Sequence, residues 1–118
     1  MPYQLQSPGQ RIIIIDNGII YKHDVDFDDP QAEAELERWD KIEECDKKYF
    51  VPIIAYRIAK KECWTAQPFL KFDESLRTWE LWELISGIAC KYCIKDIDYE
   101  WNWAVTEDGL PVIYDYAF

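Results

Sequence analysis

The sequence predicts an α+β domain with two helices, an antiparallel sheet and the element order β-β-α-β-β-α-β-β. Three observations favour this class: β-branched runs around Asn17-Gly18, two segments with apolar residues at helical spacing, and a second hairpin pattern near residue 109. At 118 residues, 49% of them hydrophobic, the chain has the length and composition of one domain with a real core. We therefore expect a single domain over residues 1–118.

The first hairpin is the clearest local pattern. Isoleucine-rich runs lie on both sides of Asn17-Gly18, and this residue pair is well suited to a tight turn that needs positive φ angles. We expect strands near 11–15 and 19–23.

Two segments carry the apolar spacing of amphipathic helices. The first helix is predicted from about Pro30 to Asp46, with Asp29 as its N-cap and Pro30 as its first residue. The second is predicted over Leu76–Cys90, with Asp73 or Ser75 as its N-cap. Each helix is expected to bury one side.

The remaining strands follow from β-branched and aromatic runs. Tyr49–Ile58 is predicted to be a strand, and Cys63–Leu70 a further, less regular extended segment. Asn102–Thr106 and Val112–Asp115 are predicted to pair as a hairpin around the turn Glu107-Asp-Gly109.

Charge and hydropathy limit the classes of partner. The chain has 13 basic and 23 acidic side chains and a formal charge of −10, so it would repel nucleic-acid phosphates, and we expect no direct nucleic-acid binding. A protein partner with a basic surface is the favoured alternative. No apolar run approaches 18 residues and nothing marks the N-terminus for export, so we expect no membrane span and a cytoplasmic location. The sequence leaves open whether the protein forms a homo-oligomer.

The four cysteines allow three interpretations: a zinc or redox site, reduced thiols without metal, and structural disulfides, which are the least favoured because nothing marks the chain for export. Cys90 and Cys93 have the C-x-x-C spacing of a zinc or redox pair, and Cys45 and Cys63 would complete four ligands. Cys45 and Cys63 are 18 residues apart, however, and form no second pair of that spacing. Reduced thiols without metal are therefore favoured over zinc.

The stretch Asp96–Ala117 resembles the catalytic-loop hairpin of the protein-kinase-like phosphotransferases, which include the aminoglycoside phosphotransferases. In that family an Asn and an Asp hold the magnesium ions on ATP, and an Asp in the loop is the catalytic base. The resemblance implies that Asn102 and Asp115 are magnesium ligands and that Asp96 and Asp98 are candidates for the base.

The resemblance extends upstream. Gly18–Lys22 is similar to the strand that ends in the phosphate-binding Lys, and the helix after it offers Glu33, Glu35 and Glu37 as acidic partners. By its distance along the chain Glu37 is preferred and Glu35 is second. Lys22, Glu35 and Glu37 are thus candidate nucleotide-binding residues. The alternative is a purely structural ion pair between Lys22 and the helix.

Several positions depart from the family pattern. No Gly-rich loop precedes Lys22, and Asp98 and Asp96 lie four and six residues before Asn102, where the family has five. Ala117 stands where the family has Gly, and the printed sequence lacks the substrate-binding helical lobe. These departures imply a truncated, pseudokinase-type protein without catalysis.

The aromatic content suggests a binding surface. Six Trp and eight Tyr are many for so small a core; Trp79 and Trp82 lie three apart on the second helix, and Trp101 and Trp103 share one face of a strand. We expect some of them to form an exposed patch rimmed by carboxylates, which suits a basic protein partner.

The favoured hypothesis is therefore a non-catalytic kinase-like module that binds protein. Small acidic proteins of this kind resemble accessory proteins of bacteriophages and mobile elements, so the hypothesis includes inhibition or modulation of a protein complex in the cytoplasm of a bacterial host, by occupation of a basic groove. The alternative is a minimal phosphotransferase that uses ATP and magnesium. A zinc-stabilised adaptor is the third hypothesis.

Overall fold

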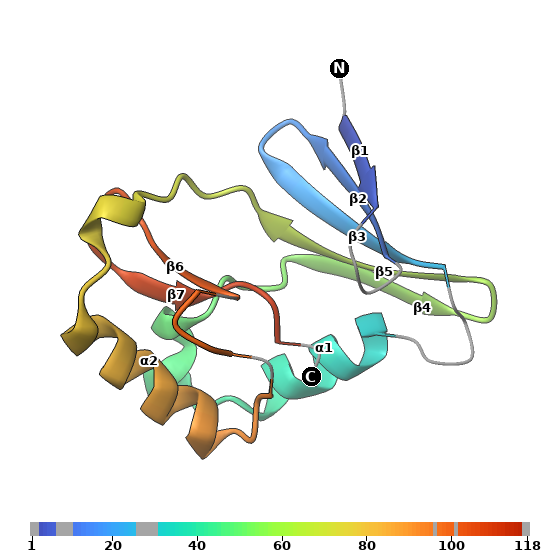
Figure 1. Ribbon diagram of the computed structural model, residues 1–118. Coiled ribbons are helices and arrows are strands. Elements are labelled where there is room, and N and C mark those ends of the chain that lie inside the picture. Colours follow the sequence, from blue (N-terminus) through green and yellow to red (C-terminus); the bar gives the residue numbers. More distant parts are fainter. Residues whose placement is uncertain (1–2, 7–10, 26–30, 96, 101, 117–118) are drawn as a thin grey trace. The chain divides into compact units, whose positions relative to one another are not determined.

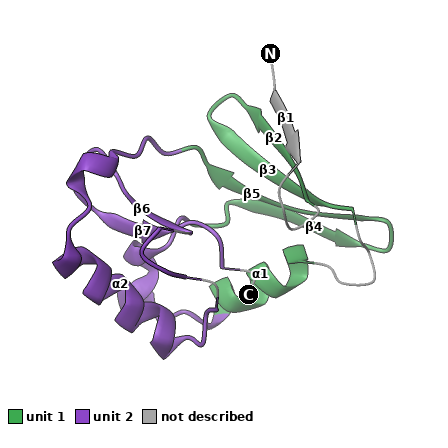
Figure 2. Ribbon diagram, viewed as in Figure 1, with its two compact units in different colours: residues 1–40, 52–69 green, residues 41–51, 70–118 purple. Residues whose placement is uncertain are grey.

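In the computed structural model of the chain (Figure 1), the described residues are 3–6, 11–25, 31–95, 97–100 and 102–116. They form an α+β fold with antiparallel strands, as the sequence predicts. The chain divides into two compact units (Figure 2): unit 1 comprises residues 1–40 and 52–69, and unit 2 comprises residues 41–51 and 70–118.

Unit 1 contains a five-stranded antiparallel sheet of order β1-β2-β3-β5-β4 and one helix between β3 and β4. The strands are β1 Tyr3–Gln6, β2 Arg11–Asp16, β3 Ile19–Asp24, β4 Ala55–Ala59 and β5 Glu62–Pro68, and the helix is α1 Gln31–Lys41. The β2–β3 hairpin turns at Asn17 and Gly18, whose φ angles of 51° and 76° are both positive, as the hairpin prediction requires. Strand β1 was not predicted.

Helix α1 is joined to the sheet at its first turn. The backbone N–H of Ala32 donates to the carboxylate of Asp24 at the end of β3, at 2.8 Å. Ala32 and Glu35 lie three residues apart on one side of the helix, and both are buried. The predicted cap Asp29 and first residue Pro30 lie outside the described residues.

Unit 2 combines one helix, two short 3₁₀ turns and a two-stranded sheet. The elements are η1 Glu44–Tyr49, η2 Glu74–Leu76, α2 Trp79–Lys91, β6 Trp103–Val105 and β7 Pro111–Ile113. Ile85 of α2, Trp103 of β6 and Ile113 of β7 are fully buried and form its core. Within the described residues, no helix combines the length and the apolar composition needed to cross a membrane.

The first predicted helix was too long. It ends at Lys41, and Glu44–Tyr49 forms a separate 3₁₀ turn. The reason is a contact distant in sequence: the backbone N–H of Glu43 donates to the hydroxyl of Tyr92 at 3.1 Å, and is thereby engaged outside a helical ladder.

Two further boundaries differ from the prediction. The strand expected over Tyr49–Ile58 begins at Ala55. The first residues of the expected strand, up to Val51, belong to unit 2: Phe50 bridges Ile113, and the Val51 N–H donates to the Ile113 carbonyl at 2.9 Å. In the C-terminal hairpin, both strands are shorter than predicted, and the second begins at Pro111.

The predicted N-cap of the second helix was also wrong. Thr78 caps α2, because its hydroxyl oxygen accepts the N–H of Leu81 at 3.2 Å. The two predicted caps, Asp73 and Ser75, instead belong to the short turn η2, which Asp73 caps by accepting the N–H of Ser75 at 3.0 Å. The helix therefore begins at Trp79 and not at Leu76.

Candidate functional site

A network of buried charged groups in unit 1 surrounds Glu35, which is fully buried. One carboxylate oxygen of Glu35 lies 3.0 Å from the ammonium nitrogen of Lys22. The other accepts a hydrogen bond from the Thr65 hydroxyl at 2.5 Å and lies 3.3 Å from Nη1 of Arg11. Each oxygen of a carboxylate that has no access to water is thus hydrogen bonded, as burial of a charge requires.

Arg11 extends the network to the start of α1. Its Nε lies 3.0 Å from a carboxylate oxygen of Asp24, and its Nη2 donates to the backbone carbonyl of Lys22 at 3.0 Å. Asp24 also accepts the N–H of Ala32. The two cations and two carboxylates of the network therefore balance in charge.

The ionisation of Glu35 depends on these neighbours. Burial by itself raises the pKa of Glu35, but the positive charges of Lys22 and Arg11 and the hydrogen bond from Thr65 outweigh it. The net result is a pKa below the ordinary value of 4.5, so Glu35 is ionised at neutral pH.

The structure pairs Lys22 with Glu35, whereas Glu33 and Glu37 are exposed on α1. Arg11, Asp24 and Thr65 were not among the predicted site residues. A signal for two of them was present: a hairpin that turns at Asn17-Gly18 places Arg11 opposite Asp24, and the structure has this register.

The candidate magnesium ligands and base lie in unit 2. Asn102 has a φ of 70°, in the left-handed region that Asn tolerates, and its carbonyl accepts the N–H of Tyr114 at 3.1 Å. Asp115 follows Tyr114 and is half-buried. The carboxylate of Asp98 accepts the N–H of Glu100 at 2.9 Å, and Asp96 lies outside the described residues.

Unit 2 also carries a cluster of rings that we call the aromatic face: Trp79, Trp82, Tyr99 and Trp103. Trp79 stacks on Tyr99 with a centroid distance of 5.9 Å, and Trp82 lies 5.8 Å from Trp103. Trp103 is fully buried, but Trp79 and Tyr99 expose 61% and 38% of their surface. Trp101, which we expected on the same face as Trp103, lies outside the described residues.

Arg77 links two members of the aromatic face, Tyr99 and Trp103. Its Nη1 donates to the carbonyl of Tyr99 at 2.7 Å, and its Nη2 donates to the carbonyl of Trp103 at 2.5 Å. The guanidinium also lies over the Trp103 ring, 4.6 Å from its centroid, in cation–π geometry. The loop that carries Tyr99 is thereby fixed against β6.

Exposed carboxylates occur in the same unit as this face. The Trp79 indole N–H donates to the carboxylate of Glu83 at 2.8 Å. Further exposed carboxylates come from the same part of the chain: Glu74, Glu80, Asp98 and Glu100. Trp79 and Tyr99 are thus exposed, as we expected for some of the aromatic residues.

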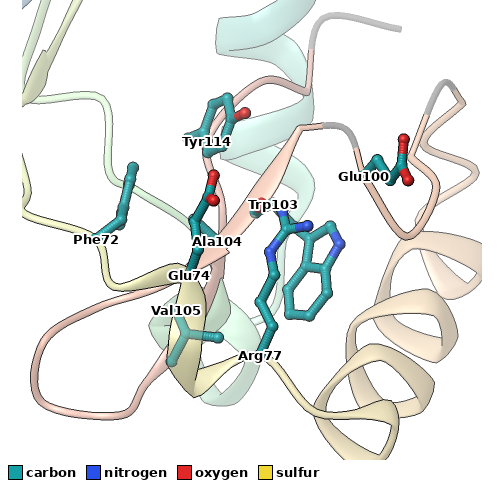
Figure 3. A pocket seen from close by; sticks show the side chains of 8 residues that line it. All are labelled: Phe72, Glu74, Arg77, Glu100, Trp103, Ala104, Val105 and Tyr114. Carbon is teal, nitrogen blue, oxygen red and sulfur yellow. Dashed lines mark hydrogen bonds between the residues drawn. The ribbon is translucent and has the colours of Figure 1, made fainter.

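A pocket of about 240 Å³ lies in the same unit (Figure 3). It is lined by residues of η2, of β6 and of the segments beside them: Phe72, Glu74, Arg77, Glu100, Trp103, Ala104, Val105 and Tyr114. The rings of Phe72 and Tyr114 stack with a centroid distance of 5.7 Å. Burial raises the pKa of the Tyr114 phenol above its ordinary value.

The cysteines are divided between the two units, with Cys63 in unit 1 and Cys45, Cys90 and Cys93 in unit 2. Cys63 is buried in unit 1, and the other three are exposed. In the described part of the chain, one group of three potential metal ligands is found, Glu43, Cys45 and Asp46, and no second cysteine belongs to it.

The carboxylate of Asp46 in this group is already engaged. It accepts a hydrogen bond from the Lys91 ammonium at 2.7 Å and a short one from the Tyr92 hydroxyl. The hydrogen bond from Lys91 and, to a smaller extent, the one from Tyr92 hold the pKa of Asp46 below its ordinary value. The hydrogen bond to Asp46 in turn raises the pKa of Lys91. An ammonium group thus lies where a metal cation would have to bind.

No model of a known protein family matches this chain, and no curated protein is significantly similar to it in sequence.

Proposed function

We propose that this protein is a non-catalytic, kinase-like binding module whose aromatic face engages a basic surface of another protein. The observation that carries the proposal is the exposure of Trp79 and Tyr99, which stack on each other in a unit that also exposes several carboxylates. Tryptophan and tyrosine are enriched among the residues that dominate binding energy at protein interfaces. Negative charge around them accelerates encounter with a positively charged partner and disfavours an acidic one.

The buried network in unit 1 supports a role without catalysis. Lys22 is only 8% exposed and its ammonium is bonded to Glu35, whose other oxygen is shared by Arg11 and Thr65. With Asp24 the network is neutral overall, so it offers no excess positive charge to the phosphates of a nucleotide. The network is therefore suited to fastening α1 to the sheet.

One observation favours the second candidate function, a minimal phosphotransferase that uses ATP and magnesium. A lysine of β3 is paired with a glutamate of the helix that follows, at 3.0 Å, as the active kinases require. In this candidate Lys22 binds phosphate, Asn102 and Asp115 hold magnesium, and Asp98 or Asp96 is the base.

The proposal also includes a biological setting. A charge of −10 on 118 residues allows the protein to compete with nucleic acid for a positively charged groove. A small protein of this type from a bacteriophage or mobile element would inhibit or modulate a host complex by filling such a groove.

The test is a fluorescence titration of the full chain with a poly-L-lysine peptide of about 20 residues. If the aromatic face is the contact, the double variant Trp79→Ala, Tyr99→Ala binds the peptide at least about tenfold more weakly, because truncation of interface hot spots costs about 2 kcal/mol or more. The matched control is Tyr56→Ala, which removes a ring that is 57% exposed on β4 and leaves the net charge unchanged.

Charge alone attracts poly-lysine to any acidic protein, so the comparison between the variants decides. Equal affinities of the double variant and the Tyr56 variant would contradict the proposal. For the second candidate, calorimetric titration with ATP and magnesium gives the answer: magnesium-dependent heat that Asp115→Asn abolishes would favour the phosphotransferase, and no heat would favour the binding module.

A further inference from the structure

Strand β4 forms one edge of the five-stranded sheet in unit 1 (Figure 1). It pairs with β5 on one side, and no strand that the structure describes pairs with its other side. In an antiparallel pair, the backbone N–H and C=O groups of alternate residues point away from the partner strand. On an edge strand these outward groups have no neighbouring strand to bond, so a further strand can pair with them.

Both faces of β4 are exposed as well. The four consecutive residues 55–58 are all exposed, although successive residues of a strand point to opposite faces of the sheet. Natural edge strands are often protected by a proline, a lysine or a covering element. Proline and lysine are absent from β4, and its one charged residue, Arg57, is paired with Glu62 of β5 at 3.1 Å. The edge is therefore accessible to an added strand.

One face of β4 extends the face of the sheet that is buried at β5. Tyr56 pairs with Thr65 and Ile58 pairs with Cys63, and residues directly opposite each other in an antiparallel pair have their side chains on the same face. Thr65 and Cys63 are buried, whereas Tyr56 and Ile58 are 57% and 38% exposed. A further strand with β-branched residues on this face would cover both side chains, because aromatic and β-branched residues form favourable cross-strand pairs.

The turn that follows β4 has a charge opposite to that of the whole chain. Lys60 and Lys61 form the two-residue turn between β4 and β5, and both are exposed. Neither forms an ion pair with any residue that the structure describes. With Arg57 and Glu62 they give residues 57–62 three cations and one carboxylate, in a chain whose formal charge is −10. This local excess of positive charge favours a negatively charged occupant.

The position of the two lysines indicates where the occupant's acidic residues should lie. Every strand pair of this sheet is antiparallel, and antiparallel pairing is slightly more stable per residue than parallel pairing. A strand added antiparallel to β4 begins beside Ala59, at the end of β4 that leads into the turn. The acidic residues of the occupant should therefore precede its apolar residues.

We infer that β4 receives an extended segment of a partner protein as a sixth, antiparallel strand, with acidic residues before a run of alternating β-branched residues. The outward backbone groups of β4 supply hydrogen bonds, Tyr56 and Ile58 supply apolar contacts, and Lys60 and Lys61 select the charge. The inference goes beyond the proposed function, because it concerns a surface of unit 1 and an occupant of the opposite charge.

The test is an NMR titration of the ¹⁵N-labelled full chain with the capped peptide Glu-Glu-Val-Thr-Val-Thr-Val in 0.1 M salt, where charges more than about 10 Å apart are screened. We expect saturable binding at least about tenfold tighter than that of Lys-Lys-Val-Thr-Val-Thr-Val. At a peptide concentration about tenfold above the dissociation constant, hydrogen exchange should slow about tenfold at every second amide of β4. Equal affinity for the two peptides, or unchanged exchange in β4, would overturn the inference.

Variants with the same change in charge locate the preference for acidic residues. Lys60→Gln, Lys61→Gln should reduce the ratio of the two affinities to less than about twofold. The matched control is Lys71→Gln, Lys95→Gln, which changes two exposed lysines of unit 2 and should leave the ratio above about fivefold. Equal effects of the two double variants would show that only the overall charge matters, which contradicts the inference.

A further variant tests the apolar contacts and the nature of the occupant. Ile58→Thr keeps a β-branched residue in β4 and should weaken binding of the acidic peptide at least about threefold; an unchanged affinity would contradict the inference. Sedimentation of the chain without peptide is the control for self-association. A dimer that Ile58→Thr dissociates would make a second copy of the chain the occupant and would overturn the choice of an acidic partner.

The two proposals fail in different ways. Tyr56→Ala should weaken binding of the acidic peptide at least about threefold but not that of poly-lysine, which the lysines of the turn repel. Trp79→Ala, Tyr99→Ala should have the reverse effects. Loss of only the first result would reject the β4 surface, and loss of only the second would reject the aromatic face.

Discussion

The two units of this protein differ in what they bury and what they expose: unit 1 buries charged groups, and unit 2 exposes aromatic rings. In unit 1, the charged groups of Arg11, Lys22, Asp24 and Glu35 are buried and bonded to one another. In unit 2, Trp79 is the most exposed of the large hydrophobic side chains that the structure describes, and its neighbouring carboxylates face solvent. Charged residues are normally outside and large rings largely inside, so both units depart from the usual distribution.

This difference is the basis of our proposal that the buried network of unit 1 provides stability and the aromatic face of unit 2 binds a partner. A buried charge is tolerated only when its partners are held in place, and in unit 1 the partners come from β2, β3, α1 and β5. The network therefore ties four elements together. In unit 2, the exposed rings and carboxylates make few bonds of their own, so a partner can still gain from contacting them.

The largest expected effect is a loss of stability when the buried network of unit 1 is disrupted. Glu35→Ala would leave Lys22 and Arg11 buried without their shared carboxylate, and removal of one partner from a buried ion pair typically lowers the free energy of unfolding by about 3–5 kcal/mol. Urea unfolding of the full chain measures this. The matched control is Glu37→Ala, two residues along the same helix and exposed, which should change stability by no more than about 0.5 kcal/mol. Similar losses in both variants would mean that the network does not carry the stability of unit 1.

An intermediate effect is expected from pH. Because the pKa of Glu35 is lower in the folded protein than the ordinary 4.5, its stabilising contribution is fully present above about pH 4.5 and is lost as the pH falls toward the folded-state pKa. One such group contributes a slope of up to about 1.4 kcal/mol per pH unit in that window. Unfolding free energies measured from pH 6 downward should fall more steeply for the wild-type chain than for Glu35→Gln. Parallel curves would show that Glu35 has an ordinary pKa.

Much of unit 1 was predictable because its decisive information is local. Asn17-Gly18 determines the turn, the turn determines the register, and the register brings Arg11 opposite Asp24. The choice between Glu35 and Glu37 was harder, because it depends on which side of α1 meets the sheet. The buried Ala32, three residues before Glu35, marks that side only once the sheet is known.

The boundaries in unit 2 could not be predicted in the same way. Lys41 ends α1 because the N–H of Glu43 finds the Tyr92 hydroxyl, 49 residues later in the chain. Phe50 is extended because it bridges Ile113, in a strand even further away. Such contacts override local propensity, and no pattern within a short window contains them. The number of Trp and Tyr residues predicts that some of them are exposed, but it does not identify Trp79 and Tyr99 as the exposed ones.

The smallest expected effect is a change in the pKa of Asp46. This carboxylate of unit 2 resembles Glu35, because it too is bonded to a lysine ammonium and a hydroxyl. Tyr92→Phe removes the hydroxyl and leaves the Lys91 ammonium in place, so we expect the pKa of Asp46 to rise toward its ordinary value of 3.8 without reaching it. The acid-side loss of the stability that Asp46 contributes would then begin at higher pH, since a depressed folded-state pKa protects a carboxylate from protonation.

Carboxyl ¹³C NMR titration of both proteins measures this change, and Asp73 provides an internal reference. The pKa of Asp73 is also lowered, but by hydrogen bonds from the Ser75 hydroxyl and N–H, which the substitution does not touch. If Asp46 moves and Asp73 does not, the Tyr92 hydroxyl contributes to holding Asp46 ionised, and unit 2 contains a partnered carboxylate like that of unit 1. If neither moves, Lys91 alone accounts for the low pKa, and Glu35 is the one carboxylate of this pair held by several groups at once.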